Sequence, residues 1–161
     1  MFNWQLRKES QSFTESIPRL LNTASTHTLW RETLKLASKK SDKIHILLAD
    51  DSPHFLRSAQ LLLRDYEIET ALDGEEALAK LRANPPDIFF VDLVLPKIRG
   101  TDLIRQVSQE YPDIPIVALT AIDDHETVQE VMDLGAKGYL IKPVSSDTFK
   151  AEIKKHIKSA E

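Results

Sequence analysis

The sequence has no cysteine, few glycines and no long apolar run, and each of these absences excludes a class of protein. Without cysteine, neither a disulfide framework nor a thiolate metal site can form. The glycines form no Gly-x-Gly-x-x-Gly pattern, which excludes a dinucleotide enzyme. No apolar stretch approaches the roughly 20 residues that a membrane helix needs, and residues 1–10 lack the apolar core of a secretory signal. We therefore expect a cytoplasmic protein without membrane insertion.

Charge divides the chain of 161 residues into a basic leading segment and an acidic body. Residues 1–43 hold eight Lys or Arg against four Asp or Glu, whereas residues 44–161 hold 13 against 21. We predict an N-terminal extension at 1–43 and one domain with its own core at 44–161. Because the body is acidic and the extension only weakly basic, we expect no direct binding to nucleic acid.

Apolar residues in the extension recur at helical spacing, which predicts one or two short amphipathic helices. A mobile tail is the alternative. If the helices form, their apolar stripe could dimerise or dock a partner through Phe13, Ile17, Leu20, Trp30 and Leu34.

From Ile44 onward, patterns typical of buried strands alternate with helix patterns five times. Apolar, β-branched runs predict strands at 44–49, 68–71, 88–91, 116–119 and 138–141. This alternation predicts an α/β fold, a flavodoxin-like doubly wound sheet of five parallel strands with helices on both faces. In the strand order 2-1-3-4-5, the first and third strands would meet at the switch point where such sheets bind ligands.

Capping residues mark where the helices begin. Ser52, followed by a proline, has the form of an N-cap. Asp123 with Glu126 has the form of a capping box. We expect the first helix to run to about Asp65. Its inward residues would be Phe55, Ala59, Leu62 and Leu63.

Polar residues follow the strands at the edge where parallel sheets place their ligands. The run 88–96 is apolar apart from Asp92, and a charge at the end of a buried strand needs a reason. Taken alone, Asp92 could simply cap the next helix or lie in solvent. The other strand ends favour a shared site, because they add Asp50, Asp51, Thr120 and Lys142.

Three carboxylates in one crevice repel each other, so they must take up protons or hold a cation. An all-oxygen ligand set favours Mg²⁺ or Mn²⁺. An aspartate such as Asp92 is ionised at neutral pH and could attack phosphorus without a general base. Lys142 could neutralise the approaching anion while Thr120 donates a hydrogen bond to a phosphoryl oxygen.

From residue 44 to about 158, the sequence resembles the CheY-like receiver domain of two-component response regulators. The resemblance rests on motifs in matching order and spacing, namely Asp50-Asp51, Val91 to Pro96 with Gly100 downstream, Thr120-Ala121 and Gly138 to Pro143. It implies that Asp92 accepts a phosphoryl group from a phosphohistidine on a sensor histidine kinase or a histidine phosphotransfer protein.

The resemblance also implies roles for the neighbouring residues. Asp51, Asp92 and the backbone carbonyl of Val94 would ligate Mg²⁺, and Asp50 would act mostly through water. Lys142 would contact the phosphoryl group.

Two further features follow from the resemblance. The bond between Lys142 and Pro143 would be cis, and Thr120 and Tyr139 would form a switch pair that responds to the added charge. Partners would read the change on the helix after the fourth strand, the fifth strand and the last helix, around Gln129, Glu130, Asp133, Lys137, Lys150 and Lys154.

Two apolar residues depart from the common pattern of the family. Neither Val94 nor Ile122 could position an attacking water, so we predict a long-lived phosphoryl group. Aspartyl phosphatases usually have a second aspartate where Val94 stands. We expect no enzymatic activity beyond the domain's own phosphorylation and dephosphorylation.

We expect no output domain after Glu161, and hence a single-domain response regulator that signals to a downstream protein target. One alternative is a phosphorelay intermediate that passes its phosphoryl group to another histidine. Another is a scaffold or adaptor whose acidic pocket is never phosphorylated. A flavodoxin-like electron carrier is disfavoured, because Asp50 and Asp51 would repel the flavin phosphate.

Overall fold

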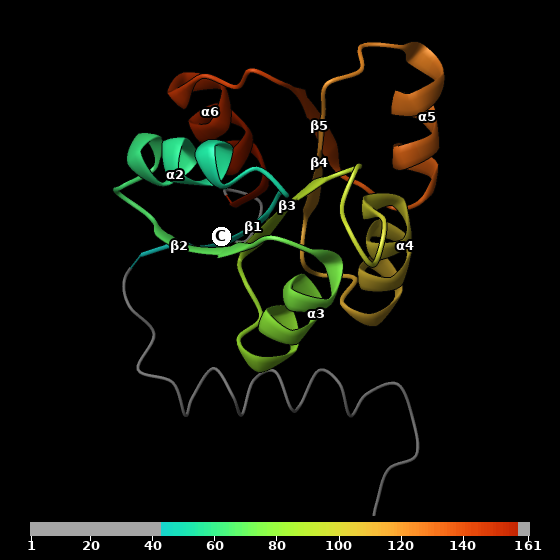
Figure 1. Ribbon diagram of the computed structural model, residues 1–161, viewed down its shortest axis with the longest axis horizontal. Helices are drawn as coiled ribbons and strands as arrows, with labels where there is room; N and C mark the ends of the chain where they lie inside the picture. The colour runs from blue at the N-terminus through green and yellow to red at the C-terminus, as the bar shows by residue number, and fades with distance from the viewer. Residues whose placement is uncertain (1–42, 158–161) are drawn as a thin grey trace, which may run out of the picture. The chain divides into compact units, whose positions relative to one another are not determined.

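The computed structural model describes residues 43–157, in which five strands alternate with five helices (Figure 1). The strands form one parallel sheet in the order β2-β1-β3-β4-β5. The predicted fold class, a flavodoxin-like doubly wound sheet, is therefore confirmed. The elements are β1 (His45–Ala49), α2 (Pro53–Leu62), β2 (Glu67–Ala71), α3 (Gly74–Ala83), β3 (Ile88–Asp92), α4 (Gly100–Glu110), β4 (Ile116–Thr120), α5 (His125–Asp133), β5 (Gly138–Ile141) and α6 (Ser146–Ile157).

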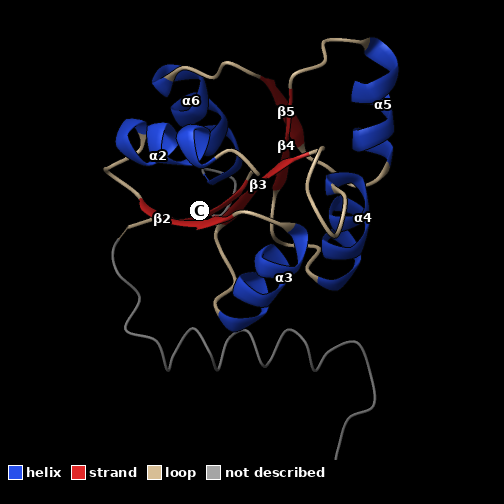
Figure 2. Cartoon of the chain, in the orientation of Figure 1, coloured by secondary structure: helices blue, strands red, loops and turns tan. Residues whose placement is uncertain are grey.

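Helices cover both faces of the sheet, with α2 and α6 on one face and α3, α4 and α5 on the other (Figure 2). Because side chains alternate along a strand, Ile46 and Leu48 of β1 pack towards α2 and α6, whereas Leu47 packs towards α3 and α4. All residues of β1 and β3 are buried, which explains their nearly continuous apolar sequence. Two apolar layers thus hold the sheet and fix where its strands end.

The first helix is shorter than predicted. It ends at Leu62 and not near Asp65, because the backbone of Leu63 has left the helical conformation, with φ −113° and ψ 25°. The N–H of Leu63 still makes the last helical bond, to the carbonyl of Ala59 at 2.9 Å. Leu62 is 39% exposed, so its predicted inward position is wrong. The buried positions are Leu56, Ala59 and Leu63, which repeat at the three- and four-residue spacing of one helix face.

The predicted cap of α5 is displaced by one residue. Asp124, and not Asp123, is the N-cap. Its carboxylate accepts the backbone N–H of Thr127 at 2.8 Å and the Thr127 hydroxyl at 2.7 Å. The expected capping box of Asp123 with Glu126 is therefore wrong, because Thr127 gives the cap at 124 a second hydrogen bond.

The predicted extension lies outside the described residues, apart from Lys43. Its amphipathic helices and its docking residues stay predictions. Within 43–157, no helix has the length and apolar character needed to cross a membrane.

Candidate functional site

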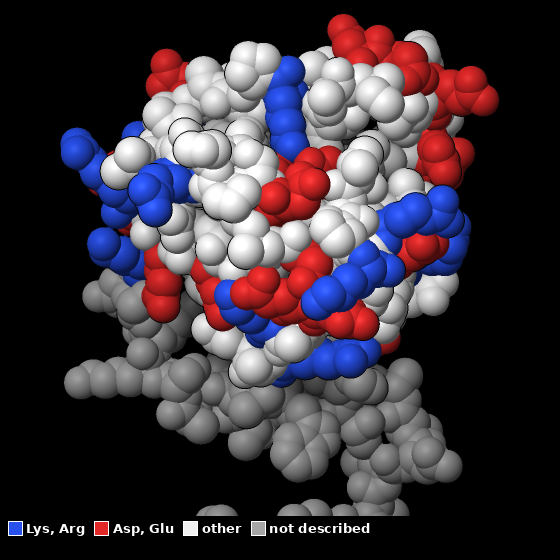
Figure 3. Space-filling view, in the orientation of Figure 1, with Lys and Arg blue, Asp and Glu red and all other residues white. Residues whose placement is uncertain are grey.

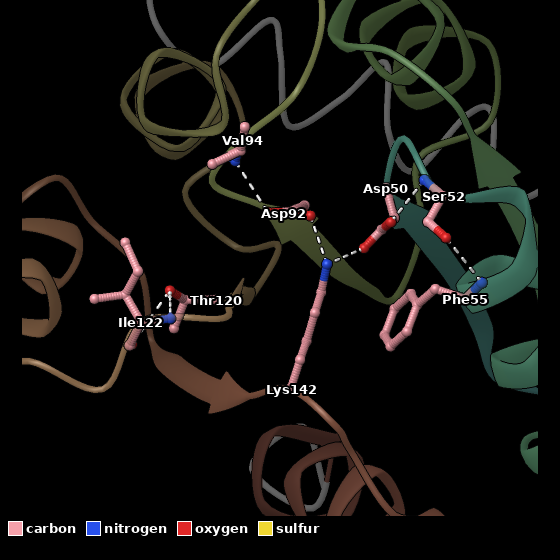
Figure 4. Close-up of polar contacts among 8 residues, drawn as sticks. All are labelled: Asp50, Ser52, Phe55, Asp92, Val94, Thr120, Ile122 and Lys142. Carbon is pink, nitrogen blue, oxygen red and sulfur yellow. Dashed lines mark hydrogen bonds and ion pairs between the residues drawn. The ribbon is translucent and has the colours of Figure 1, made fainter.

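The sheet topology brings the polar strand ends together. β1 and β3 are neighbours, and Ala49 lies opposite Val91. Asp50 and Asp92 each come one residue later, so they leave adjacent strands side by side. Thr120 ends β4 and Lys142 follows β5, along the same edge of the sheet (Figure 4).

Asp50, Asp51 and Asp92 form an acidic cluster in which one carboxylate oxygen of each lies within 4.8 Å of the others. Asp50 is fully buried and Asp92 is 7% exposed, whereas Asp51 lies at the surface. The backbone N–H of Ser52 donates to Asp50 at 2.9 Å, and that of Val94 donates to Asp92 at 2.9 Å. Three carboxylates held this closely are a donor set that fits a hard divalent cation such as Mg²⁺.

Lys142 lies between the two buried carboxylates. Its Nζ donates to Oδ2 of Asp50 and to Oδ2 of Asp92 (Figure 4). Burial lowers the pKa of Lys142, but the bonds to the two carboxylates outweigh this and raise the pKa above its ordinary value of 10.5. Burial raises the pKa of Asp50 above 3.8, because the bonds from Lys142 and from the Ser52 N–H offset only part of the desolvation. The lysine is thus a firmly charged group inside the acidic cluster.

Gly100 lets α4 begin directly against the end of β3. A Cβ at this position would lie 2.0 Å from the carbonyl oxygen of Asp92. The N–H of Gly100 also donates to the carbonyl of Leu93 at 3.1 Å. Any larger residue would therefore push α4 away from the strand that carries Asp92.

Thr120 and Tyr139, the predicted switch pair, differ in burial. Thr120 is 3% exposed, and its Oγ1 accepts the backbone N–H of Ile122 at 2.9 Å (Figure 4). Tyr139 on β5 is 40% exposed. The threonine hydroxyl thus faces the β4–α5 connection, while the tyrosine ring is partly in solvent.

The peptide bond between Lys142 and Pro143 is cis.

Phe55 contacts the site, and sequence reasoning did not assign it there. The Nζ of Lys142 lies 4.6 Å from the centroid of the Phe55 ring (Figure 4). The spacing of apolar residues in the sequence indicates only that Phe55 faces inward on the first helix. The contact depends on how α2 packs against the chain after β5, which no local pattern indicates.

The fold and the acidic cluster are those of CheY-like signalling domains. Residues 46–154 match the family model of the response regulator receiver domain, so the chain belongs to this family of two-component signalling domains. The chain is 35% identical over 118 residues to the alkaline phosphatase synthesis transcriptional regulatory protein PhoP of Bacillus subtilis, covering 72% of this chain and 49% of that protein. It is 31% identical over 124 residues to the sensor histidine kinase TmoS of Ectopseudomonas mendocina, covering 74% and 12% respectively.

A solved structure of the Vibrio cholerae chemotaxis protein CheY4 is also similar. It is 32% identical in sequence, has a TM-score of 0.66, and the match covers 70% of this chain and 98% of that chain. The chain spans about half the length of the curated response regulators that it matches.

Proposed function

We propose that this domain accepts a phosphoryl group on Asp92. A carboxylate oxygen of Asp92 attacks the phosphorus of a phosphohistidine on a partner protein. The bond from phosphorus to the imidazole nitrogen breaks, and its electron pair stays on that nitrogen. The step needs no general base, because an aspartate carboxylate at neutral pH has no proton to lose.

We infer that Mg²⁺, or Mn²⁺ in its place, binds at the acidic cluster. Asp51, Asp92 and the Val94 carbonyl would hold the cation, with Asp50 acting mostly through water. Bound there, the cation would offset the repulsion between the carboxylates and the incoming phosphoryl oxygens. The support is the donor set itself, three carboxylates within 4.8 Å of one another.

Lys142 would contact the phosphoryl group. Its Nζ already bonds to Asp92, so a small shift would pair it with a phosphoryl oxygen. Thr120 would leave the Ile122 N–H and donate its hydroxyl to another phosphoryl oxygen. The inward movement of Thr120 would open space for the partly exposed ring of Tyr139 to turn in.

The surface formed by α5, β5 and α6 would carry this change to a downstream protein target. Acidic side chains gather over α5 (Figure 3), where the exposed acids are Asp123, Asp124, Glu126, Glu130 and Asp133. A target with basic groups would be complementary to this surface. The similarity to a sensor histidine kinase supports a phosphodonor of the histidine kinase pathway, either a kinase or a phosphotransfer protein.

The observation that carries the proposal is the buried carboxylate of Asp92 beside two further carboxylates and an ammonium group. Incubation with phosphoramidate and Mg²⁺, read by intact mass, tests it. The parent and the surface control Asp65→Asn should each gain one phosphoryl group, and Asp92→Asn should gain none. Phosphorylation that persists in Asp92→Asn would contradict the assignment.

A further inference from the structure

A closed circuit of contacts joins Asp50, Ser52, Phe55 and Lys142 (Figure 4). Asp50 Oδ1 accepts the N–H of Ser52 at 2.9 Å, and Ser52 Oγ accepts the N–H of Phe55 at 3.3 Å. The ring of Phe55 faces the Nζ of Lys142, which returns to Asp50 by an ion pair. The N-cap of α2 thus ties the position of an aromatic ring to the acidic cluster.

Two other aromatic side chains, Phe149 and Phe90, hold the phenyl ring of Phe55 in place. The centroids of Phe55 and Phe149 are 6.5 Å apart, and Phe149 packs edge-on against Phe90 at 5.3 Å. Phe90 and Phe149 are fully buried, whereas Phe55 is only partly buried. Because it is fixed from behind, the Phe55 ring forms one wall of the environment of Lys142.

We propose that Phe55 is a positioning residue for Lys142 and that it sets how strongly the lysine competes with a divalent cation. The inference rests on the proposed metal site. Lys142 bonds to Asp50 and Asp92, which are two of the three carboxylates in the acidic cluster. An ammonium group and a divalent cation are attracted by the same negative charge and repel each other. Binding of one at these carboxylates therefore disfavours binding of the other.

An aromatic face attracts an ammonium group that lies over it. The Phe55 ring therefore stabilises Lys142 inside the acidic cluster in the absence of metal. A leucine at position 55 keeps an apolar side chain but removes this attraction. The lysine then leaves the carboxylates more readily, and Mg²⁺ should bind about two- to tenfold more tightly.

The sign of this effect separates positioning from a merely structural role. If Phe55 only supported the fold, its replacement would loosen the carboxylates and weaken Mg²⁺ binding. Phe55→Tyr retains an aromatic face and should therefore keep the parent dissociation constant. Leu62 lines the same cavity as Phe55 on α2, so Leu62→Ala is the matched control for lost apolar volume.

Calorimetric titration with Mg²⁺ of the parent, Phe55→Leu, Phe55→Tyr and Leu62→Ala tests the inference. The expected result is tighter binding in Phe55→Leu alone. If the parent binds Mg²⁺ and Phe55→Leu binds it equally or more weakly, the role of Phe55 is overturned. If the parent does not bind Mg²⁺, the proposed metal site itself is overturned.

A second measurement uses the parent fold and does not depend on Phe55→Leu being stable. In nuclear magnetic resonance spectra recorded in EDTA, the side-chain methylene protons next to Nζ of Lys142 should be shifted upfield by the ring current of Phe55. Lys142→Arg identifies these signals by their loss. Signals at the ordinary lysine position would overturn the inference.

Discussion

Replacing Asp92 by asparagine tests the balance of charge in the acidic cluster. Asparagine has nearly the same shape and keeps an acceptor for the N–H of Val94, which donates to the parent carboxylate at 2.9 Å. It removes one of three neighbouring negative charges. We expect the Mg²⁺-free variant to be as stable as the parent, or more stable by up to about 2 kcal/mol.

The magnitude follows from opposing effects of similar size. The variant loses the repulsion from the Asp50 carboxylate. An oxygen of that carboxylate lies within 4.8 Å of one of Asp92, which corresponds to a repulsion of about 3.5 kcal/mol at an effective dielectric constant near 20. It also loses the repulsion from Asp51. Against this, it loses the attraction to Lys142, about 6 kcal/mol at hydrogen-bonding distance on the same scale. The variant no longer buries a charge at a position that is 7% exposed, which favours it.

Urea denaturation followed by circular dichroism, in EDTA and then in Mg²⁺, measures the difference. Asp65→Asn is the matched control, because Asp65 is 68% exposed at its side chain and pairs with Lys150 at 3.4 Å. In EDTA, a loss of more than about 1 kcal/mol in Asp92→Asn but not in Asp65→Asn would refute the reasoning, since the attraction to Lys142 would then dominate. Added Mg²⁺ should stabilise the parent more than Asp92→Asn.

Other positions give further expectations. Val94→Asn should shorten the life of the phosphoryl group severalfold, because a polar side chain can position water; unchanged decay of the phosphorylated mass would count against this. Asp124→Ala should cost about 1 kcal/mol of unfolding free energy and Asp123→Ala almost none, and equal losses would contradict the assigned cap. The hydrogen bond from Lys97 lowers the pKa of Asp73 below 3.8, so its stabilisation is present above that pH and is lost as the pH falls through the folded pKa. Asp73→Asn should therefore flatten the dependence of Tm on pH below about 4, and an unaltered slope would refute the link.

Much of the fold is predictable because its signals are local. The buried strands are short apolar runs, and polar residues at their ends mark where each strand leaves the core. Parallel strands end at one edge of a sheet, so the alternation of strands and helices predicts that Asp50 and Asp92 lie at the same edge. Their adjacency also needs the strand order 2-1-3-4-5, which places β1 beside β3.

The remaining features depend on contacts between segments that are distant in sequence. The approach of Phe55 to Lys142 depends on how α2 packs, and the bond of Lys142 to both buried carboxylates depends on the end of β5. The choice of Asp124 over Asp123 as a cap depends on the Thr127 hydroxyl, because both aspartates fit the local pattern. Sequence periodicity carries no information on such contacts.

A crystal structure with Mg²⁺ and beryllofluoride, a mimic of the phosphoryl group, tests most directly whether the acidic cluster binds a cation and receives phosphate. The expected result is a cation held by Asp51, Asp92 and the carbonyl of Val94, with beryllofluoride on Asp92 and the Lys142 ammonium turned towards it. An empty cluster under saturating Mg²⁺ and beryllofluoride, or beryllofluoride bound away from Asp92, would contradict the proposed function.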